Sequence, residues 1–328
     1  MNTRHIGPLE VAEIGLGCMN LSHAYAAPPP AEDGKRLIHR ALELGVTHFD
    51  TAALYGFGAN ETLVGAALEG HRHRVVLASK CGMTGVDGKR VIDGRPETIL
   101  KTCEESLRRL RTDVIDVYYL HRWDKRVPIE DSVGAMAQLV AKGSIRAIGL
   151  SEVSAATLRK AHAVHPIAAV QSEYSLWSRN PEIAMLDACR ELRVSFVAFS
   201  PLARGFLAGA IDDPATLGPK DIRSGMPRFQ EPAFGKNRVL VAKLQEIATA
   251  NGCTPAQLAL AWLLQKAPIV VPIIGTTSIA HLEEDLSAAK VSLSPAVVTQ
   301  VEALINQHTV AGARYPAATQ LEIDTEEF

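Results

Sequence analysis

Short apolar stretches alternate with longer amphipathic stretches through most of this chain of 328 residues. The apolar stretches have the length of β-strands and the amphipathic ones the length of helices, which is the pattern of repeated βα units. Eight such units can be counted, with strands expected at Glu13–Leu16, Val46–Phe49, Val75–Ser79, Val114–Leu120, Ile145–Leu150, Ala168–Gln171, Ser195–Phe199 and Ile269–Pro272. Strands of a parallel barrel are buried on both faces and are continuously apolar, as these nearly are. The pattern therefore predicts an α/β fold, a (β/α)8 barrel of the TIM type.

Three local features refine this prediction. Asp116 interrupts the fourth apolar stretch and requires a partner. Helices are expected to begin at Pro96, at Thr254-Pro255 and at Asn180-Pro181, because proline is favoured in the first turn of a helix. Ile6 to Val11 is expected to form a small hairpin before the first barrel strand.

Length and composition favour one domain, residues 1–328, because barrels of this kind routinely reach this size. The chain is 47% hydrophobic with a formal net charge of −2. The hydrophobic fraction allows a large core. The small negative net charge argues against a general attraction to nucleic acid or to an anionic membrane. The expected partners are small molecules, and the sequence sets no oligomeric state.

The five cysteines form neither a C-x-x-C pair nor a Cys/His cluster, and their odd number suits a reducing compartment. No apolar run approaches the roughly 18 residues that a transmembrane helix requires. The N-terminal stretch is short and polar, so we expect a cytoplasmic location. His71 and His73 lack the further ligands that a zinc site needs, and no metal is expected.

Four polar residues stand at or just beyond the ends of predicted strands: Asp50, Tyr55, Lys80 and His121. The C-terminal ends of the strands are where a parallel barrel concentrates its chemistry. Taken singly, each residue has an ordinary structural interpretation, as a cap, a loop aromatic, an end charge or a hydrogen-bonded core histidine. Their common position at the strand ends favours a catalytic site.

Several short motifs accompany these residues in order. They are Ile14-Gly15-Leu16-Gly17-Cys18-Met19, Tyr55-Gly56 with Asn60-Glu61, Gly149-Leu150-Ser151, Ser200-Pro201-Leu202, and Gly275-Thr276-Thr277 with Leu282-Glu283-Glu284. Together they resemble the aldo-keto reductase superfamily over nearly the whole chain. The resemblance implies an NAD(P)-dependent oxidoreductase that interconverts an aldehyde or ketone with its alcohol. It also implies that Asp50, Tyr55, Lys80 and His121 form the catalytic tetrad.

The chemistry of carbonyl reduction agrees with this assignment. A hydride must reach carbon and a proton must reach oxygen, so the protein must supply an acid. Tyr55 is the candidate acid, and the ammonium group of Lys80 is expected to lower its pKa. Asp50 would keep a buried Lys80 charged, and His121 would donate a hydrogen bond to the substrate oxygen.

Two other classes of protein are considered. One is a channel β-subunit-like or otherwise regulatory barrel, because relatives of that kind keep the fold. The other is a phosphate-sugar isomerase barrel, which would use a glutamate base and leave Tyr55 and Lys80 without a role.

The expected cofactor site differs from the doubly wound dinucleotide fold, because no G-x-G-x-x-G follows a predicted strand. The last βα loop instead offers amides, hydroxyls and a helix N-terminus for a phosphate. By resemblance, the adenosine side of the cofactor contacts Gly275, Thr276, Thr277, Ser278, His281, Glu284 and Asp285. The family commonly has basic residues in this region and asparagine at Asp285, and this chain has neither. NADP(H) is favoured, because most of the resembled family uses it and because hydroxyls and amides can hold a phosphate. NAD(H) is the alternative, because the basic residues that would ordinarily pair with a 2′-phosphate are missing.

The remaining cofactor contacts also follow from the resemblance. Phe199 would lie under the nicotinamide ring, while Ser151 and Gln171 would bind its carboxamide. Arg204 is expected near the pyrophosphate. Further contacts are implied for Gly17, Cys18, Met19, Asp50, Ser200, Pro201 and Leu202.

The substrate pocket is expected to be mostly apolar, which suits a bulky or aromatic carbonyl compound. Besides Tyr55 and His121, the candidates for it are Leu54, Trp123 and Trp177, although both tryptophans could serve in packing instead. Two segments without clear periodicity are expected near it. The long loop after strand seven, Leu202 to Asn237, is either a mobile surface insertion or, as the resemblance favours, a cover over the cofactor. By resemblance, the C-terminal tail from Thr309 would cross the barrel mouth.

Overall fold

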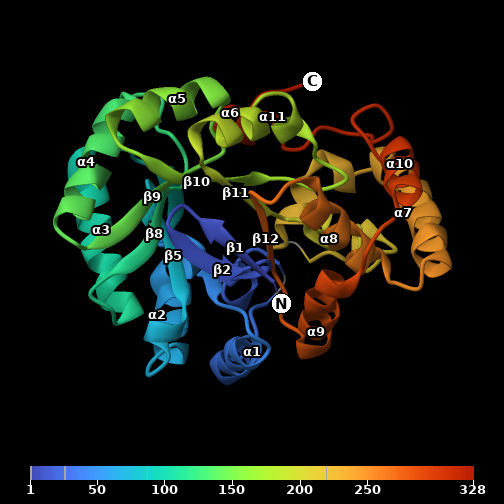
Figure 1. Ribbon diagram of the computed structural model, residues 1–328, viewed down its shortest axis with the longest axis horizontal. Coiled ribbons are helices and arrows are strands. Elements are labelled where there is room, and N and C mark those ends of the chain that lie inside the picture. The colour runs from blue at the N-terminus through green and yellow to red at the C-terminus, as the bar shows by residue number, and fades with distance from the viewer. Residues whose placement is uncertain (1, 26, 87, 219) are drawn as a thin grey trace.

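The computed structural model describes residues 2–25, 27–86, 88–218 and 220–328, and a closed barrel of parallel strands forms its centre (Figure 1). In order around the barrel the strands are β3 (Gly15–Gly17), β4 (His48–Asp50), β5 (Val76–Cys81), β8 (Ile115–Leu120), β9 (Ile145–Ser151), β10 (Ile167–Glu173), β11 (Ser195–Phe199) and β12 (Val270–Ile274). All eight predicted strands are present, with ends that differ by no more than three residues. The expected (β/α)8 barrel is confirmed.

Side chains fill the inside of the barrel. Tyr119 of β8 is fully buried there beside Val117 and Val197. A Cβ atom at Gly149 of β9 would lie 2.2 Å from Cδ1 of Tyr119, so only glycine leaves room for this ring. Asp116, the polar exception in β8, has the required partners on the outer side: Arg72 at 2.7 Å and Arg146 at 3.1 Å.

Helices surround the barrel (Figure 1). They are α1 (Ala31–Glu43), α2 (Ala59–Ala67), α3 (Pro96–Leu110), α4 (Ile129–Ala141), α5 (Ala155–Val164), α6 (Met185–Leu192), α7 (Ala233–Ala250), α8 (Pro255–Lys266), α9 (Ile279–Ser287), α10 (Pro295–Leu304) and α11 (Ala317–Gln320). In the part of the chain that the structure describes, no helix is both long enough and apolar enough to cross a membrane.

Two of the three predicted helix starts are confirmed. α3 begins at Pro96, and α8 begins at Pro255 with a complete capping box between Thr254 and Gln257. The third is wrong by four residues. Asn180–Glu182 forms a single 3-10 turn, Ala184 leaves the helical region at φ −150°, and regular helix starts at Met185.

The N-terminal hairpin closes one end of the barrel. β1 (Thr3–Ile6) and β2 (Leu9–Ala12) pair antiparallel, and Figure 1 shows them across the barrel opening. Ile6 and Val11 are buried against the interior residues of the barrel. Glycine at position 7 has φ +56°, and a Cβ there would lie 2.7 Å from that of Ala168. The expected hairpin is confirmed.

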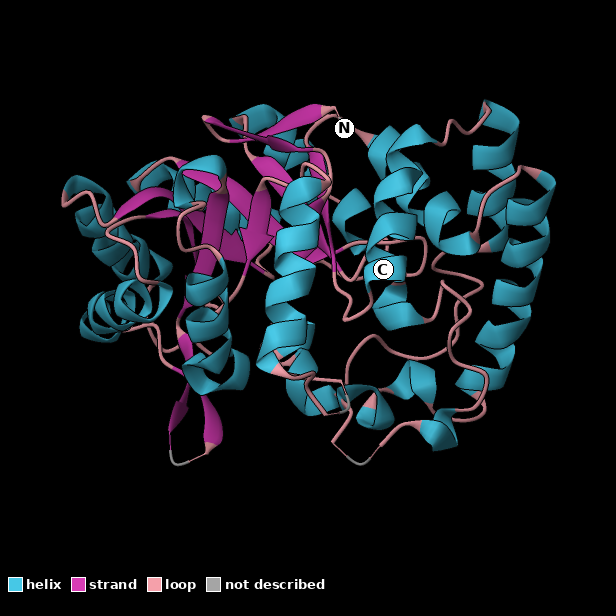
Figure 2. Ribbon diagram, turned by 90° about the horizontal axis from the view of Figure 1, so that it is seen from below, coloured by secondary structure: helices cyan, strands magenta, loops and turns pink. Residues whose placement is uncertain are grey.

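The opposite end of the barrel carries irregular structure. A second hairpin, β6 (Met83–Val86) and β7 (Lys89–Ile92), projects there, away from the N-terminal hairpin (Figure 2). The described part of the long loop after β11 contains four 3-10 turns: Ala203–Gly205, Pro214–Thr216, Ile222–Gly225 and Pro227–Phe229. α7 begins at Ala233, inside the segment expected to be a loop. The C-terminal tail forms the short helix α11.

Candidate functional site

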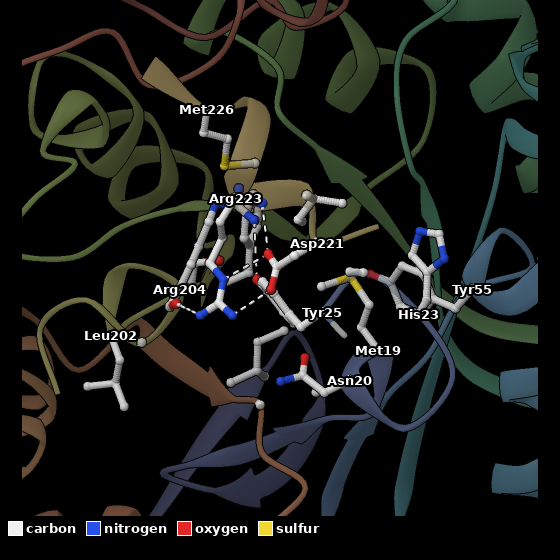
Figure 3. Close-up of a pocket in the computed structure, with 18 of the residues that line it drawn as sticks. Met19, Asn20, His23, Tyr25, Tyr55, Leu202, Arg204, Asp221, Arg223 and Met226 are labelled. Atoms are coloured by element: carbon white, nitrogen blue, oxygen red, sulfur yellow. Dashed lines mark hydrogen bonds and ion pairs between the residues drawn. The ribbon is translucent and has the colours of Figure 1, made fainter. Parts of the chain in front are cut away.

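A cavity of about 900 Å³ opens at the C-terminal ends of the barrel strands. Its lining includes the ends of β3, β4, β9, β10, β11 and β12, part of the β6–β7 hairpin, the long loop and the tail. Met19, His23 and Tyr55 lie on one side of it, and Arg204, Asp221 and Arg223 lie on the other (Figure 3). The volume is within the range of small-molecule and cofactor sites.

Asp50, Lys80 and Tyr55 form a continuous chain of contacts beside this cavity. Asp50 ends β4, Lys80 lies near the end of β5, and both side chains are buried. Lys80 Nζ donates hydrogen bonds to the Asp50 carboxylate, to the carbonyl oxygen of Thr51 at 2.9 Å and to the Tyr55 hydroxyl at 3.3 Å. The arrangement is the one expected from the sequence.

His121 completes the group of four. It follows β8 directly and its ring lies edge-on to that of Tyr55, with centroids 5.7 Å apart. The side chain is 8% exposed, and its Nδ1 atom has no hydrogen-bond partner among the described residues. His121 and Tyr55 therefore face the same cavity.

Burial and neighbouring charges together set the protonation of this group. Burial raises the pKa of Tyr55, and the opposing charge of Lys80 does not reverse the shift. Lys80 lowers this pKa, as expected from the sequence, but burial raises it by more. Burial also lowers the pKa of His121 well below its usual value, and Lys80 and Arg122 lower it further. Burial works against the charge of Lys80, but Asp50 and Tyr55 outweigh it and raise the lysine pKa. At neutral pH the site therefore holds a protonated tyrosine, a neutral histidine and a charged lysine.

A turn of unusual conformation presents Tyr55. Gly56, Phe57 and Gly58 have φ values of +56°, +51° and +94°. Positive φ is accessible to glycine without strain. The tight turn places the tyrosine over β4 and starts α2 at once.

The Asn60-Glu61 motif supports this turn from below. Asn60 donates to the carbonyl oxygen of Cys18 at 2.8 Å and accepts from the Thr51 hydroxyl at 2.6 Å. Glu61 accepts from the Ser79 hydroxyl at 2.5 Å and pairs with Arg109 at 2.7 Å. Both buried residues hold the ends of β3, β4 and β5 together.

Most residues expected to contact the cofactor line the cavity. They are Gly17, Met19, Asp50, Ser151, Gln171, Phe199, Ser200, Pro201, Leu202, Arg204, Gly275, Thr276, Thr277 and His281. Gln171 donates to the Asp50 carboxylate at 2.8 Å, so it also belongs to the chain of contacts around Lys80.

Four of the expected cofactor residues lie outside the lining. Cys18 is fully buried behind β3, and its backbone N–H donates to Asp50. Ser278 caps α9 by accepting from the N–H of His281. Glu284 and Asp285 lie further along α9, and burial followed by the charge of Glu284 raises the pKa of Asp285 to about 7.

Arg204 is already engaged. It pairs with Glu173 at 3.1 Å and donates to the hydroxyls of Tyr315 at 3.2 Å and Tyr25 at 3.4 Å. Arg223 pairs with Asp221 at 2.6 Å and lies over the ring of Tyr25 (Figure 3). The loop after β11, the segment after β3 and the tail are joined here over the cavity.

Of the residues expected to contact the substrate, some line the cavity and others do not. Leu54 lines the cavity beside Tyr55 and His121, whereas Trp123 and Trp177 are not part of its lining. Trp123 donates to the carbonyl oxygen of Val127 at 2.9 Å. Trp177 is buried against Phe206 and Phe229, with ring centroids 4.2 and 6.0 Å away. Both tryptophans take the packing role considered for them.

Several lining residues had no signal in the sequence. They are Asn20, His23, Tyr25, Met83, Arg90, Arg122, Ile211, Ile222, Met226 and Tyr315. Most stand in the β6–β7 hairpin, the long loop and the tail, where no periodicity indicates direction. Asn20, His23 and Tyr25 lie in the segment after β3, and the position of Arg122 directly after His121 was the one available signal. Within the described residues, no group of three or more His, Cys, Asp or Glu side chains could hold a metal ion.

The sequence profile of the Aldo/keto reductase family matches residues 13–306. The chain is 43% identical over 332 residues to the aldo-keto reductase yakc of Schizosaccharomyces pombe, covering 98% of this chain and 97% of that protein. It is 42% identical to probable aldo-keto reductase 1 of Glycine max, covering 93% and 89%.

Solved structures agree with this result. The glycerol dehydrogenase AKR11B4 from Gluconobacter oxydans superposes with a TM-score of 0.84 at 29% identity, covering 95% of this chain and 97% of that one. The aldo-keto reductase AKR11C1 from Bacillus halodurans superposes with a TM-score of 0.79 at 28% identity, covering 97% and 99%.

The chain belongs to the aldo/keto reductase family. It is an oxidoreductase that interconverts a small carbonyl compound with its alcohol. None of the matched proteins named above supports the channel-subunit or regulatory interpretation.

Proposed function

We propose that Tyr55 is the general acid of carbonyl reduction, and that Lys80, Asp50 and His121 complete the catalytic group. The observation that carries this proposal is the position of Lys80 Nζ, buried between the Asp50 carboxylate and the Tyr55 hydroxyl. The carbonyl oxygen of the substrate accepts hydrogen bonds from Tyr55 and His121 in the cavity. The reduced nicotinamide supplies the hydride when it is bound.

The protonation states support these roles. Because burial raises its pKa, Tyr55 keeps its proton at neutral pH and can deliver it to the developing alkoxide. The phenolate that remains is stabilised by the adjacent ammonium of Lys80, which Asp50 keeps charged. His121 is neutral, so it donates one hydrogen bond to the substrate oxygen and takes up no proton.

We propose NADP(H) as the cofactor. The cavity offers the backbone of Gly275 and the Thr276 and Thr277 side chains before the N-terminus of α9, a position that favours phosphate. Phe199 at the end of β11 lines the same cavity and offers a ring face for the nicotinamide. The name of the Schizosaccharomyces pombe relative carries NADP(+).

The test is Tyr55→Phe, which removes only the phenolic oxygen and its proton. Reduction of a good aldehyde should fall by at least the 10² to 10⁴-fold typical of general acid catalysis. The dissociation constant for NADPH, measured by fluorescence titration, should stay within a factor of about three. Turnover within threefold of the parent enzyme would show that another group supplies the proton.

Two further assignments are proposed. Residues 1–328 form one domain, supported by a tail that pairs with the ends of β9 and β10 through Arg314. The protein works in the cytoplasm, supported by five cysteines that are all free thiols.

A further inference from the structure

Arg122 is a buried guanidinium that lines the cavity next to His121. The residue is 8% exposed. Its Nη1 atom donates to the carbonyl oxygen of His121 at 2.7 Å and to the Ser151 hydroxyl at 3.3 Å. Its Nε atom is buried and has no hydrogen-bond partner among the described residues. Because a guanidinium carries donors on all three nitrogens, these contacts leave part of it unused.

The other arginines around the cavity are neutralised by carboxylates. The pairs are Arg90 with Glu322 at 2.6 Å, Arg204 with Glu173 at 3.1 Å, and Arg223 with Asp221 at 2.6 Å. Within the described ranges of the chain, no carboxylate oxygen lies within 4.0 Å of the Arg122 nitrogens. Arg122 is thus a buried cation that faces the cavity without a counter-charge.

The charge of Arg122 acts on the reacting group. After burial and Lys80, it is the next cause that lowers the pKa of His121, and it opposes the raised pKa of Tyr55. Lys80 is paired with Asp50, whereas Arg122 is not paired. A buried charge without a partner is unfavourable, and an anionic group of a ligand removes this penalty through short, charge-assisted hydrogen bonds.

Two anions could reach this cavity, a phosphate of the cofactor or a carboxylate of the substrate. The Gly275 loop and the N-terminus of α9 offer the phosphate site, after β12. Arg122 follows β8 and contacts Ser151 at the end of β9. It contacts His121 directly, and its charge acts on Tyr55, so it stands nearer to the two residues that would hold the substrate carbonyl than to the phosphate site.

We propose that Arg122 forms an anion-binding subsite, and that this reductase prefers aldehydes or ketones that carry a carboxylate group. The inference rests on the proposed function, because it takes the surroundings of Tyr55 and His121 as the place of the substrate carbonyl.

The first experiment measures binding without turnover. Benzoate and the uncharged benzamide are titrated by calorimetry into the enzyme saturated with NADP+. The parent enzyme should bind benzoate about tenfold or more tightly than benzamide, as expected for hydrogen bonds to a charged group. Arg122→Met should abolish this preference, and Arg122→Lys should keep part of it. Arg126→Met is the matched control, because that side chain is 76% exposed on the same loop and pairs with Asp124 outside the cavity.

The second experiment compares 4-carboxybenzaldehyde with 4-formylbenzamide. The ratio of the two kcat/KM values should favour the acid in the parent enzyme and in Arg126→Met. It should fall about tenfold to a hundredfold in Arg122→Met, the range expected for a charge-assisted pair.

The proposal is overturned if the parent enzyme shows no preference for the carboxylate, or if the ratio is unchanged in Arg122→Met. It is also overturned if Arg122→Met mainly weakens NADPH binding, because Arg122 would then serve the cofactor. An active Tyr55→Phe enzyme would refute the proposed acid and leave the benzoate measurement intact, so the two failures can be told apart.

Discussion

At the scale of single residues, burial has more influence on the pKa values of Tyr55 and His121 than the charges beside them. Tyr55 has a lysine at 3.3 Å, yet its pKa is raised because the desolvation of a phenolate outweighs the attraction of the ammonium. The same desolvation keeps His121 neutral. An acid that holds its proton at neutral pH suits the reductive direction of the reaction.

Asp285 on α9 gives a prediction at this scale. Burial raises its pKa from the usual 3.8 to about 7. A carboxyl whose pKa is raised in the folded state stabilises the fold below pH 3.8, and this stability is lost as the pH rises to about 7. The asparagine in Asp285→Asn cannot ionise. The free energy of unfolding of this variant, relative to that of the parent protein, should therefore increase between pH 4 and 7, by at most about 4 kcal/mol.

The measurement is urea unfolding of the cofactor-free protein at several pH values. Glu283→Gln is the control, because that exposed neighbour pairs with Arg40 on the surface and its effect should stay within about 1 kcal/mol. A difference between Asp285→Asn and the parent that does not change with pH contradicts the prediction.

At the scale of elements, the ends of strands and the first turns of helices carry the proposed site. The turn from Tyr55 to Gly58 needs positive φ at successive positions, and Asn60 and Glu61 at the start of α2 tie it to the neighbouring strands. The loop before α9 offers hydroxyls and amides, while Ser278 is occupied as the N-cap. A phosphate there would be held without a basic side chain from α9 itself.

The cofactor preference can be tested at this element. With hydroxyls and amides alone, NADPH should bind only modestly better than NADH. His281 lines the cavity and is exposed in the first turn of α9, so His281→Arg adds a cation without removing a cap. This variant should widen the preference for NADPH by at most about 1.5 to 3 kcal/mol.

The readout is the pair of dissociation constants for NADPH and NADH in each protein, by fluorescence titration. His281→Gln serves as the uncharged control and should leave the ratio near that of the parent. Tighter binding of NADH by the parent protein would overturn the choice of NADP(H).

At the scale of the whole molecule, the C-terminal tail is tied to the barrel by buried charges. Arg314 contacts Glu152 after β9 and Glu173 at the end of β10, and these three side chains are at most 7% exposed. Asp324 accepts hydrogen bonds from Ser154 and Thr157 at the start of α5. These contacts hold Tyr315 against Arg204 at the cavity.

Arg314→Met removes the cation and leaves two buried carboxylates with fewer partners. Breaking a buried pair in this way typically costs about 3 to 5 kcal/mol. The matched control is Arg95→Met, whose 58% exposed side chain pairs with Asp93, and whose loss should cost about 0 to 1 kcal/mol. Urea unfolding at pH 7.5 measures both. A loss below about 1 kcal/mol for Arg314→Met would show that the tail is not held by this pair.

The sequence was sufficient for the barrel and for the four polar residues at its mouth. Strands such as β8 and β9 are short apolar runs between helical stretches, and this pattern depends on neighbours along the chain. Lys80 and His121 stand at strand ends, so the register of a parallel barrel brings them to one end without further information. The Asn180 helix start was misplaced because Glu182 is held in a 3-10 turn by Tyr174 and Arg179.

Tertiary structure alone decided the contacts between segments that are distant in sequence. Trp177 could line a pocket or pack, and only the positions of Phe206 and Phe229 determined that it packs. The partner of Arg314 lies 162 residues away at Glu152, and no local pattern specifies such a pair. The direction of the Tyr55 pKa and the unpaired charge of Arg122 depend in the same way on burial, because desolvation is set by every segment that closes over a side chain and not by its neighbours in the sequence.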